Sequence, residues 1–165
     1  MSKIKVLFVC LGNICRSPMA EGIFQHLVQE RQLEHHFEID SAGTSGWHNG
    51  ELPDPNMMKT AALHGINLES RSRKFIKEDF EKFDYIIPMD QSNLRNMKAL
   101  QPTAAQVEKL HMMRAYDKTR SGADVEDPYG MAMDGFERCY QVLLEANSNF
   151  LEELVERHEL ESSKI

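Results

Sequence analysis

The sequence predicts an α/β protein in which helices cover both faces of a four-stranded parallel sheet, forming a three-layer αβα sandwich. Segments typical of buried strands alternate with segments whose apolar residues recur at helical spacing, and this alternation usually indicates a parallel sheet. The chain has 165 residues, of which 41% are hydrophobic and 27% charged, as in ordinary globular proteins. No shift in composition divides it, so we expect a single domain over residues 1–165.

The first strand and the first helix are the clearest elements. Residues 4–9 are apolar and β-branched, and they are followed by a Gly-Asn turn signal. Pro18 suits the first turn of a helix, where its missing N–H would have no partner in any case. Apolar residues then recur at helical spacing over residues 23–28. We therefore expect strand, loop and helix between Val6 and the end of this periodic segment.

The same alternation continues to the end of the chain. Further strands are expected at residues 37–40, 84–89 and 107–112. Further helices are expected at residues 57–64, 78–83 and 92–100, and from about Asp134 onward. The segment between the last strand and the last helix, residues 115–133, is too long to be only a connection, which makes it a candidate functional loop.

Charge and composition exclude several classes of function. The net charge of −7 argues against a broad basic surface that would hold nucleic acid or an anionic membrane. The longest apolar run, residues 6–11, is too short for a membrane span or a signal peptide. Three cysteines do not form a disulfide framework. We expect a cytoplasmic protein that binds neither nucleic acid nor a membrane.

The loop after the first strand carries the strongest functional signal. In open parallel sheets, ligands bind beyond the carboxyl ends of the strands, and converging backbone N–H groups at a helix N-terminus attract anions. Gly12 and Asn13 tolerate the left-handed backbone conformations that a tight loop needs. Arg16 supplies a fork of donors that matches two phosphate oxygens. The sequence therefore predicts a phosphate-binding loop after the first strand.

Cys10 stands where this loop begins. A thiol at a helix N-terminus beside a cation loses its proton near neutral pH and becomes a nucleophile, and Ser17 can donate its hydroxyl to the sulfur. A single cysteine at the end of a strand is more often a small buried residue. The string Cys-x5-Arg-Ser-Pro between a strand and a helix favours the nucleophile.

Other phosphate and metal sites fit the sequence poorly. A Walker-type nucleotide loop needs Gly-Lys, and this pair is absent from the chain. Cys10 and Cys15 have four residues between them, whereas a thioredoxin-like motif has two. The seven histidines lack the paired spacing of zinc ligands. We expect neither a metal nor a cofactor.

Four stretches resemble the low-molecular-weight protein tyrosine phosphatases. They are VCLGNICRSPMAE from Val9, SAGTSGWHNGELPDPNMM from Ser41, MDQSNLRNM from Met89 and VEDPYG from Val125. The resemblance implies hydrolysis of protein phosphotyrosine through a phosphocysteine intermediate. It implies that Cys10 is the nucleophile, that Arg16 clamps the phosphate, and that Asp127 is the general acid.

The resemblance also implies supporting roles and partners. The phosphate loop and its hydrogen-bonded support would comprise Leu11, Gly12, Asn13, Ile14, Cys15, Ser17 and Ser41. Trp47 and Tyr129 would line the mouth of the substrate cleft. Cys15 would be a redox partner that captures oxidised Cys10 as a disulfide. The expected partners are phosphotyrosine proteins, among them tyrosine kinases or their substrates, with inorganic phosphate as product or inhibitor, and we expect a monomer or weak dimer.

The chain departs from the family pattern at two positions, and a third residue bears on substrate choice. Gly130 stands where some members carry a second tyrosine, and Ser70 stands where a histidine is common. Relatives that act on phosphoarginine carry threonine in place of Ile14, whose bulk favours a flat phenyl ring.

Cys139 lies among apolar positions of the last helix and is expected to be a buried, inert thiol.

The sequence bears on three alternative functions. Related arsenate reductases relay oxidation through two further cysteines after the third strand, and residues 84–112 contain none. A module that only binds phosphotyrosine would need neither a thiolate nor an acid. Small phosphate esters remain open as substrates.

Overall fold

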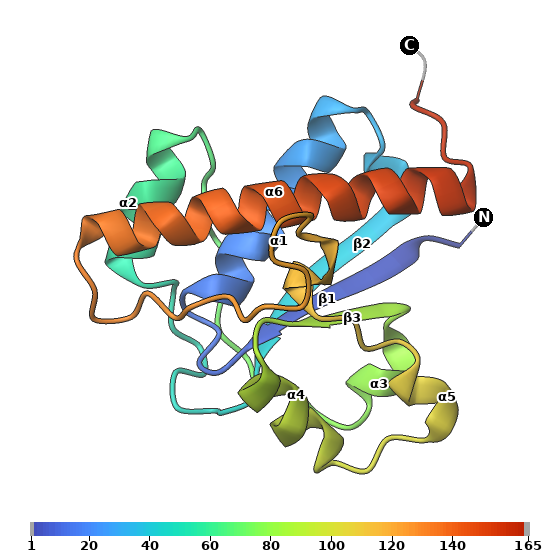
Figure 1. Cartoon of the computed structure of the whole chain (residues 1–165), viewed down its shortest axis with the longest axis horizontal. Helices are drawn as coiled ribbons and strands as arrows, with labels where there is room; N and C mark the ends of the chain where they lie inside the picture. The colour runs from blue at the N-terminus through green and yellow to red at the C-terminus, as the bar shows by residue number, and fades with distance from the viewer. Residues whose placement is uncertain (1, 164–165) are drawn as a thin grey trace.

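The sheet is parallel, with its central strand buried on both faces. The computed structural model describes residues 2–163. Within this range the sheet has three strands, in the order β2-β1-β3 (Figure 1). They are β1 (Ile4–Cys10), β2 (Phe37–Gly43) and β3 (Tyr85–Pro88). β1 is buried from Val6 to Cys10, as expected of a parallel strand that is covered on both sides.

The prediction of a fourth strand at residues 107–112 is wrong. Thr103 accepts a hydrogen bond from the Gln106 N–H and caps a short helix, α5 (Ala104–Val107), which takes up the start of this segment. Leu110 then makes a single parallel bridge to Ile86 of β3. A 3-10 helix, η2 (Met113–Tyr116), follows directly and prevents further pairing. The predicted αβα fold class is confirmed, with a narrower sheet.

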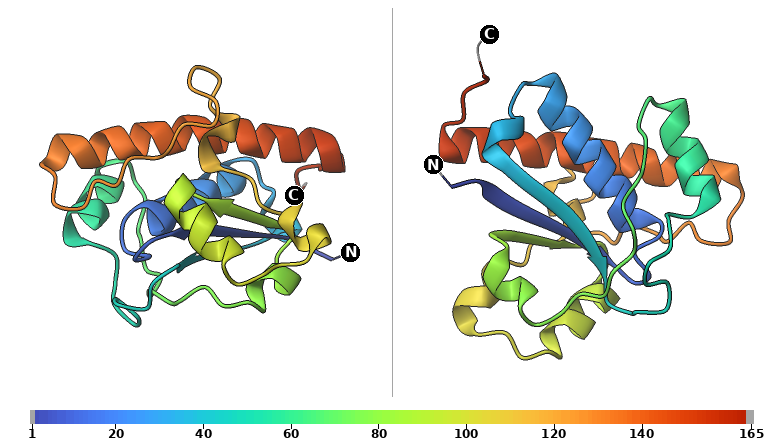
Figure 2. Two further views of the ribbon diagram at one scale, coloured as in Figure 1. Left: turned by 60° about the horizontal axis from the view of Figure 1, so that its bottom comes forward. Right: turned by 180° about the vertical axis from the view of Figure 1, so that it is seen from behind.

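Helices form a layer on each face of the sheet (Figure 2). One layer contains α1 (Arg16–Glu30), α2 (Pro55–Leu63) and α6 (Met133–His158). The other contains α3 (Asp79–Lys82), α4 (Gln91–Lys98) and α5. A short 3-10 helix, η1 (Glu34–His36), precedes β2. Among residues 2–163, no helix combines the length and apolar character needed to cross a membrane.

Two apolar clusters, one on each face, follow from the alternation of side chains along β1. Phe8 faces the layer of α1 and α6, where its ring lies 5.7 Å from that of Phe24 and 6.4 Å from that of Phe150, centroid to centroid. Leu7 and Val9 belong to the cluster on the opposite face. Packing on both faces fixes the carboxyl end of β1, and with it Cys10.

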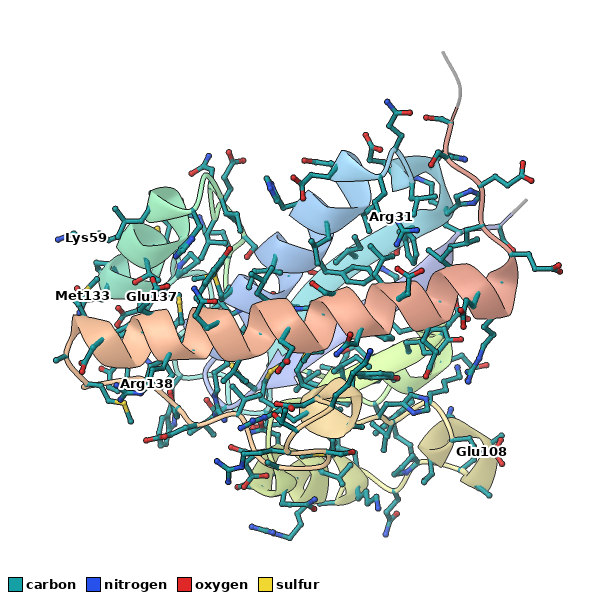
Figure 3. The ribbon with its side chains drawn as sticks, turned by 45° about the horizontal axis from the view of Figure 1, so that its top comes forward. Arg31, Lys59, Glu108, Met133, Glu137 and Arg138 are labelled. Carbon is teal, nitrogen blue, oxygen red and sulfur yellow. The ribbon has the colours of Figure 1, made fainter. Side chains whose placement is uncertain are left out.

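The long helix α6 is joined to its neighbours by polar contacts at two points. Figure 3 shows Glu137 near α2, where His64 Nε2 donates to its two carboxylate oxygens at 2.9 and 3.0 Å. The His64 ring also stacks on Tyr140, with centroids 3.7 Å apart. Arg31, just beyond α1, pairs with Glu152 at 3.0 Å. These contacts hold α6 beside α1 and α2.

Candidate active site

The loop between β1 and α1 turns its carbonyl groups outward. The carbonyl oxygens of residues 10, 11, 12 and 14 accept hydrogen bonds at 2.8 to 3.0 Å from Thr44 N–H, Ser45 N–H, Ser72 Oγ and Asp54 N–H respectively. The backbone N–H groups of residues 12–15 donate to no other group in the described part of the chain. An outward row of carbonyls with free N–H groups on the inside is an anion-binding concavity.

The first turn of α1 adds to this concavity. No side chain caps α1, whereas Asp54, Asp90 and Thr103 cap α2, α4 and α5. The first N–H groups of a helix have no partner within the helix and carry its partial positive charge. Without a cap, these groups at the start of α1 are available to an anion.

Asn13 holds the loop in shape. Its φ of 56° is left-handed. Its Nδ2 donates to Ser17 Oγ at 2.7 Å and to Ser41 Oγ at 3.0 Å, while its Oδ1 accepts from the Arg73 N–H at 3.1 Å. The amide therefore joins β2 and the segment before α3 to the loop, and all three side-chain contacts constrain its strained backbone.

Of the two loop residues expected to tolerate a left-handed backbone, Asn13 adopts it and Gly12 does not. A Cβ at Gly12 would lie 3.1 Å from His48 Cδ2, a tight contact with a side chain. Gly43, at the end of β2, is more restricted, since a Cβ there would lie 2.8 Å from the Leu11 carbonyl oxygen. The shape of the loop therefore depends on the left-handed backbone of Asn13 and on the absence of a side chain at Gly43, and a side chain at Gly12 would crowd His48.

The Cys10 sulfur lies at the base of the loop. The residue is 3% exposed, and its Sγ is 3.0 Å from Ser17 Oγ. Because Ser17 Oγ accepts a hydrogen bond from Asn13, its own proton is free to be donated to the sulfur. Such a bond stabilises a thiolate.

Arg16 is buried, with one side of its guanidinium already bonded. Nη1 donates to Asp90 Oδ2 at 2.6 Å and to the Val125 carbonyl at 3.0 Å. Nε is buried and has no partner among the described residues. Burial alone would lower the pKa of Arg16, but the Cys10 sulfur and Asp90 raise it above its ordinary value. Nε and Nη2, on the same side of the group, can bind two oxygens of one anion.

Asp127 faces Arg16 from the loop before α6. Its Oδ2 lies 3.6 Å from Arg16 Nη2, and its Oδ1 accepts from the Tyr129 N–H at 3.1 Å. The loop is fixed just before this residue, because the Val125 N–H donates to the Met89 carbonyl at 2.8 Å and its carbonyl accepts from Arg16. The side chain of Asp127 is 43% exposed, as a proton donor to a bound ligand requires.

These residues surround one cleft of about 260 Å³. Nine of the predicted site residues line it: Cys10, Leu11, Gly12, Ile14, Cys15, Arg16, Trp47, Asp127 and Tyr129. The other three, Asn13, Ser17 and Ser41, are buried behind the loop. Ser45 and His48 also line the cleft, and no sequence signal had indicated them.

The mouth of the cleft is aromatic and open. Trp47 is 83% exposed and Tyr129 is 60% exposed. Gly130 follows with a φ of 82°, a left-handed conformation that a tyrosine rarely adopts. A second tyrosine at this position would require a different local backbone, so the wall of this cleft rests on two aromatic residues.

The two other thiols differ from Cys10 in their surroundings. Cys15 lines the cleft, and burial, together with the charge of Asp54, raises its pKa strongly. Burial raises the pKa of Cys139 to about 12. Cys139 is 5% exposed on α6, in agreement with the expected buried thiol.

Three charged residues next to the site were missed by sequence analysis. Asp90 follows β3 directly, and its position at a strand end was a usable signal. Arg73, between α2 and α3, pairs with Asp40 and Asp79 at 3.1 Å each. Glu21 is buried in α1 and accepts a hydrogen bond from Ser41 Oγ at 2.6 Å. Neither Arg73 nor Glu21 had a local signal.

The known proteins that resemble this chain in sequence and in structure include several phosphatases. A sequence model of the family described as low molecular weight phosphotyrosine protein phosphatase matches residues 5–160. A low molecular weight phosphotyrosine protein phosphatase of Schizosaccharomyces pombe is 43% identical over 92% of this chain and 97% of its own. A protein tyrosine phosphatase from Entamoeba histolytica, with Hepes in its active site, superposes with a TM-score of 0.89 at 36% identity, over 96% of this chain and 100% of that one. A Drosophila arginine phosphatase superposes with a TM-score of 0.83 at 37% identity, over 92% and 98%.

Proposed function

The chain belongs to the low molecular weight phosphotyrosine protein phosphatase family, and we propose that it hydrolyses protein phosphotyrosine through a phosphocysteine on Cys10. Asp127 serves as the general acid and Arg16 as the phosphate clamp. The observation that carries this proposal is the buried Arg16 Nε, which has no partner within residues 2–163, beside a loop that lines the same cleft and whose N–H groups of residues 12–15 have no acceptor in that range.

Binding depends on the loop and on Arg16. The phosphate oxygens accept hydrogen bonds from the N–H groups of residues 12–15 and of the first turn of α1. Arg16 Nε and Nη2 bind two of these oxygens, while Asp90 and the Val125 carbonyl hold the other side of the guanidinium. These donors are in place before the reaction and stabilise the charge that develops on the equatorial oxygens.

Transfer to the enzyme forms a sulfur–phosphorus bond and breaks the phosphorus–oxygen bond to tyrosine. A phenolate is a poor leaving group, since the pKa of tyrosine is about 10. Asp127 gives its proton to the phenolic oxygen as the bond breaks, and such an acid typically contributes about 10²- to 10⁴-fold. Tyrosine leaves neutral, and Asp127 becomes a carboxylate.

Hydrolysis of the phosphocysteine reverses these roles. The Asp127 carboxylate takes a proton from a water molecule whose oxygen attacks phosphorus. The sulfur–phosphorus bond breaks, and its electron pair returns to Cys10. The Ser17 hydroxyl, 3.0 Å from the sulfur, stabilises the thiolate that leaves. Phosphate is then released, and the enzyme returns to its initial state.

The cleft favours an aryl phosphate. The Ile14 side chain lines it with apolar surface, and Trp47 and Tyr129 provide exposed rings at its mouth. A flat phenyl ring can pack against such groups. The guanidinium of phosphoarginine carries N–H donors that would be left without acceptors beside Ile14.

The general acid is tested by changing the leaving group. Asp127→Asn should lower kcat/KM, which reports transfer to Cys10 and not the later hydrolysis, about 100-fold on a phosphotyrosine peptide. It should lower kcat/KM on p-nitrophenyl phosphate much less, because p-nitrophenolate leaves without a proton. Glu126→Gln, a neighbouring carboxylate, is the matched control and should keep both activities. Equal losses on the two substrates would remove Asp127 from this role.

A further inference from the structure

A continuous chain of hydrogen bonds joins the buried carboxyl of Glu21 to the Cys10 sulfur. Glu21 Oε1 is 2.6 Å from Ser41 Oγ, and Ser41 Oγ is 3.0 Å from Asn13 Nδ2. Asn13 Nδ2 is 2.7 Å from Ser17 Oγ, which is 3.0 Å from Cys10 Sγ. All five residues are at most 8% exposed. The proposed mechanism uses only the sulfur end of this chain.

The groups around the chain fix the direction of its hydrogen bonds from Glu21 to Ser17. The Arg73 N–H donates to Asn13 Oδ1, so the Asn13 amide must present its two N–H groups to Ser41 and Ser17. Ser41, which accepts from Asn13, must then donate its own proton to Glu21. Ser17, which also accepts from Asn13, can donate to Cys10 at 3.0 Å or to the Ala42 carbonyl at 3.4 Å.

We propose that Glu21 is a positioning residue for the nucleophile. Its carboxylate accepts a hydrogen bond from the Ser41 hydroxyl, and this bond keeps Asn13 and Ser17 placed so that the Ser17 hydroxyl donates to the Cys10 sulfur. The inference rests on the proposed function, because it assigns Glu21 to the phosphocysteine chemistry. Without an acceptor at Glu21, the Ser41 hydroxyl would rotate toward other acceptors and would no longer be held in place to accept from Asn13 Nδ2. Asn13 would then lose one of the contacts that constrain its backbone.

The charges that face Glu21 come from two other segments. Asp40, on β2, accepts from the Ser41 N–H at 2.8 Å and pairs with Arg73. Arg73 and Ser70 lie between α2 and α3, and both favour the ionised carboxyl of Glu21. Burial acts in the opposite direction, as does Asp40, and the pKa of Glu21 is raised to about 7. The acceptor is therefore fully charged only above neutral pH.

Solvent protons can reach this carboxyl from the side away from Cys10. A cleft of about 280 Å³ lies on that side, and its walls include Glu21, Gln25, Asn67, Glu69 and Ser70. Glu69 also brings a negative charge to this cleft. Glu21 can thus change its protonation state without any opening of the phosphate loop.

The test compares two replacements of Glu21 on a phosphotyrosine peptide. Glu21→Ala removes the acceptor and should lower kcat about tenfold at pH 8, the effect of one lost hydrogen bond to a charged group. Because Ser17 acts on sulfur as it leaves, kcat should fall more than kcat/KM, and phosphocysteine should accumulate as a burst of tyrosine release. Glu21→Gln keeps an acceptor oxygen and should restore kcat to within about twofold of the parent.

The pH profile provides a readout that a purely structural role would not change. The ratio of parent kcat to Glu21→Gln kcat should be about two above pH 7 and approach one as the pH falls to 6, because the protonated carboxyl of Glu21 resembles glutamine. The Glu21→Gln variant should keep a constant ratio to Glu21→Ala over the same range. Glu30→Gln, an exposed carboxyl on the same helix, is the control and should match the parent throughout.

A second variant guards against a folding defect in the first. Ser41→Ala interrupts the same chain, so the double variant Glu21→Ala with Ser41→Ala should lose no more than the larger single loss. Additive losses, parental kcat in Glu21→Ala, or equal falls in kcat and kcat/KM without a burst would each overturn the inference while leaving the phosphatase proposal intact. Absence of turnover in the parent would overturn both.

Discussion

Replacing Glu21 by glutamine should make the protein more stable above neutral pH. The carboxyl of Glu21 is buried, and its pKa is raised from an ordinary 4.5 to about 7. That difference corresponds to about 3 kcal/mol, the largest gain that glutamine, which resembles the protonated carboxyl, can give at high pH. The charge of the buried Glu21 carboxylate therefore lowers the stability of the native protein above neutral pH.

The raised pKa of Glu21 determines at which pH the parent becomes less stable than Glu21→Gln. Below pH 4.5 the carboxyl is protonated in the folded and unfolded states, so parent and Glu21→Gln should be equally stable. Between pH 4.5 and 7 only the unfolded state releases the proton, and the parent loses stability as the pH rises. Above pH 7 the loss is complete, and the difference between the two proteins is constant.

Thermal unfolding measured by circular dichroism at pH 5 and pH 8 tests this prediction. For a chain of this size, about 3 kcal/mol corresponds to an increase in Tm of roughly 6–12 °C, so Glu21→Gln should gain at least about 5 °C at pH 8 and little at pH 5. The buffer must lack phosphate, because a bound ligand adds stability of its own. Glu30→Gln should show no such dependence. A Glu21→Gln variant no more stable than the parent at pH 8 would refute the reasoning.

Three further predictions concern the phosphate loop. Ile14→Thr should raise hydrolysis of phosphoarginine relative to phosphotyrosine, and an unchanged ratio in parallel kinetics would contradict the apolar contact proposed for Ile14. Cys15→Ser should recover less activity than the parent after peroxide treatment followed by a thiol, since oxidised Cys10 then lacks a neighbouring thiol; equal recovery would exclude the redox role. Asn13→Ala should lower the free energy of unfolding by about 3–6 kcal/mol, through three lost hydrogen bonds and a left-handed backbone. A loss under about 1 kcal/mol in urea titrations would show that other contacts hold the loop.

The parts of the site that could be predicted are those with a local cause. A cysteine, a left-handed asparagine and an arginine between a strand and a helix are adjacent in sequence, so their chemistry can be inferred from spacing alone. Asp127 could be assigned only through resemblance, because an Asp-Pro turn has no chemical signature of its own. In the folded chain Asp127 Oδ2 lies 3.6 Å from Arg16 Nη2, although more than a hundred residues separate the two in sequence.

The parts that could not be predicted depend on distant partners. Arg73 is one of several basic residues in its segment, and only the folded chain pairs it with Asp40 and Asp79. Glu21 lies in an ordinary helical segment, and its importance arises from the hydroxyl of Ser41 on β2. The prediction of a fourth strand was wrong for a local reason. The Thr103 cap starts α5, which includes the first residue of the predicted strand.

The central claim is that Cys10 is the nucleophile of a metal-independent phosphatase. The most direct measurement is phosphate release from a phosphotyrosine peptide, with a chelator and a thiol present, by the parent, by Cys10→Ser and by Cys139→Ala as a buried-thiol control. The account predicts steady turnover by the parent and by Cys139→Ala, and none by Cys10→Ser. Parental turnover by Cys10→Ser, or a parent that binds phosphate but releases none from the peptide, would contradict it.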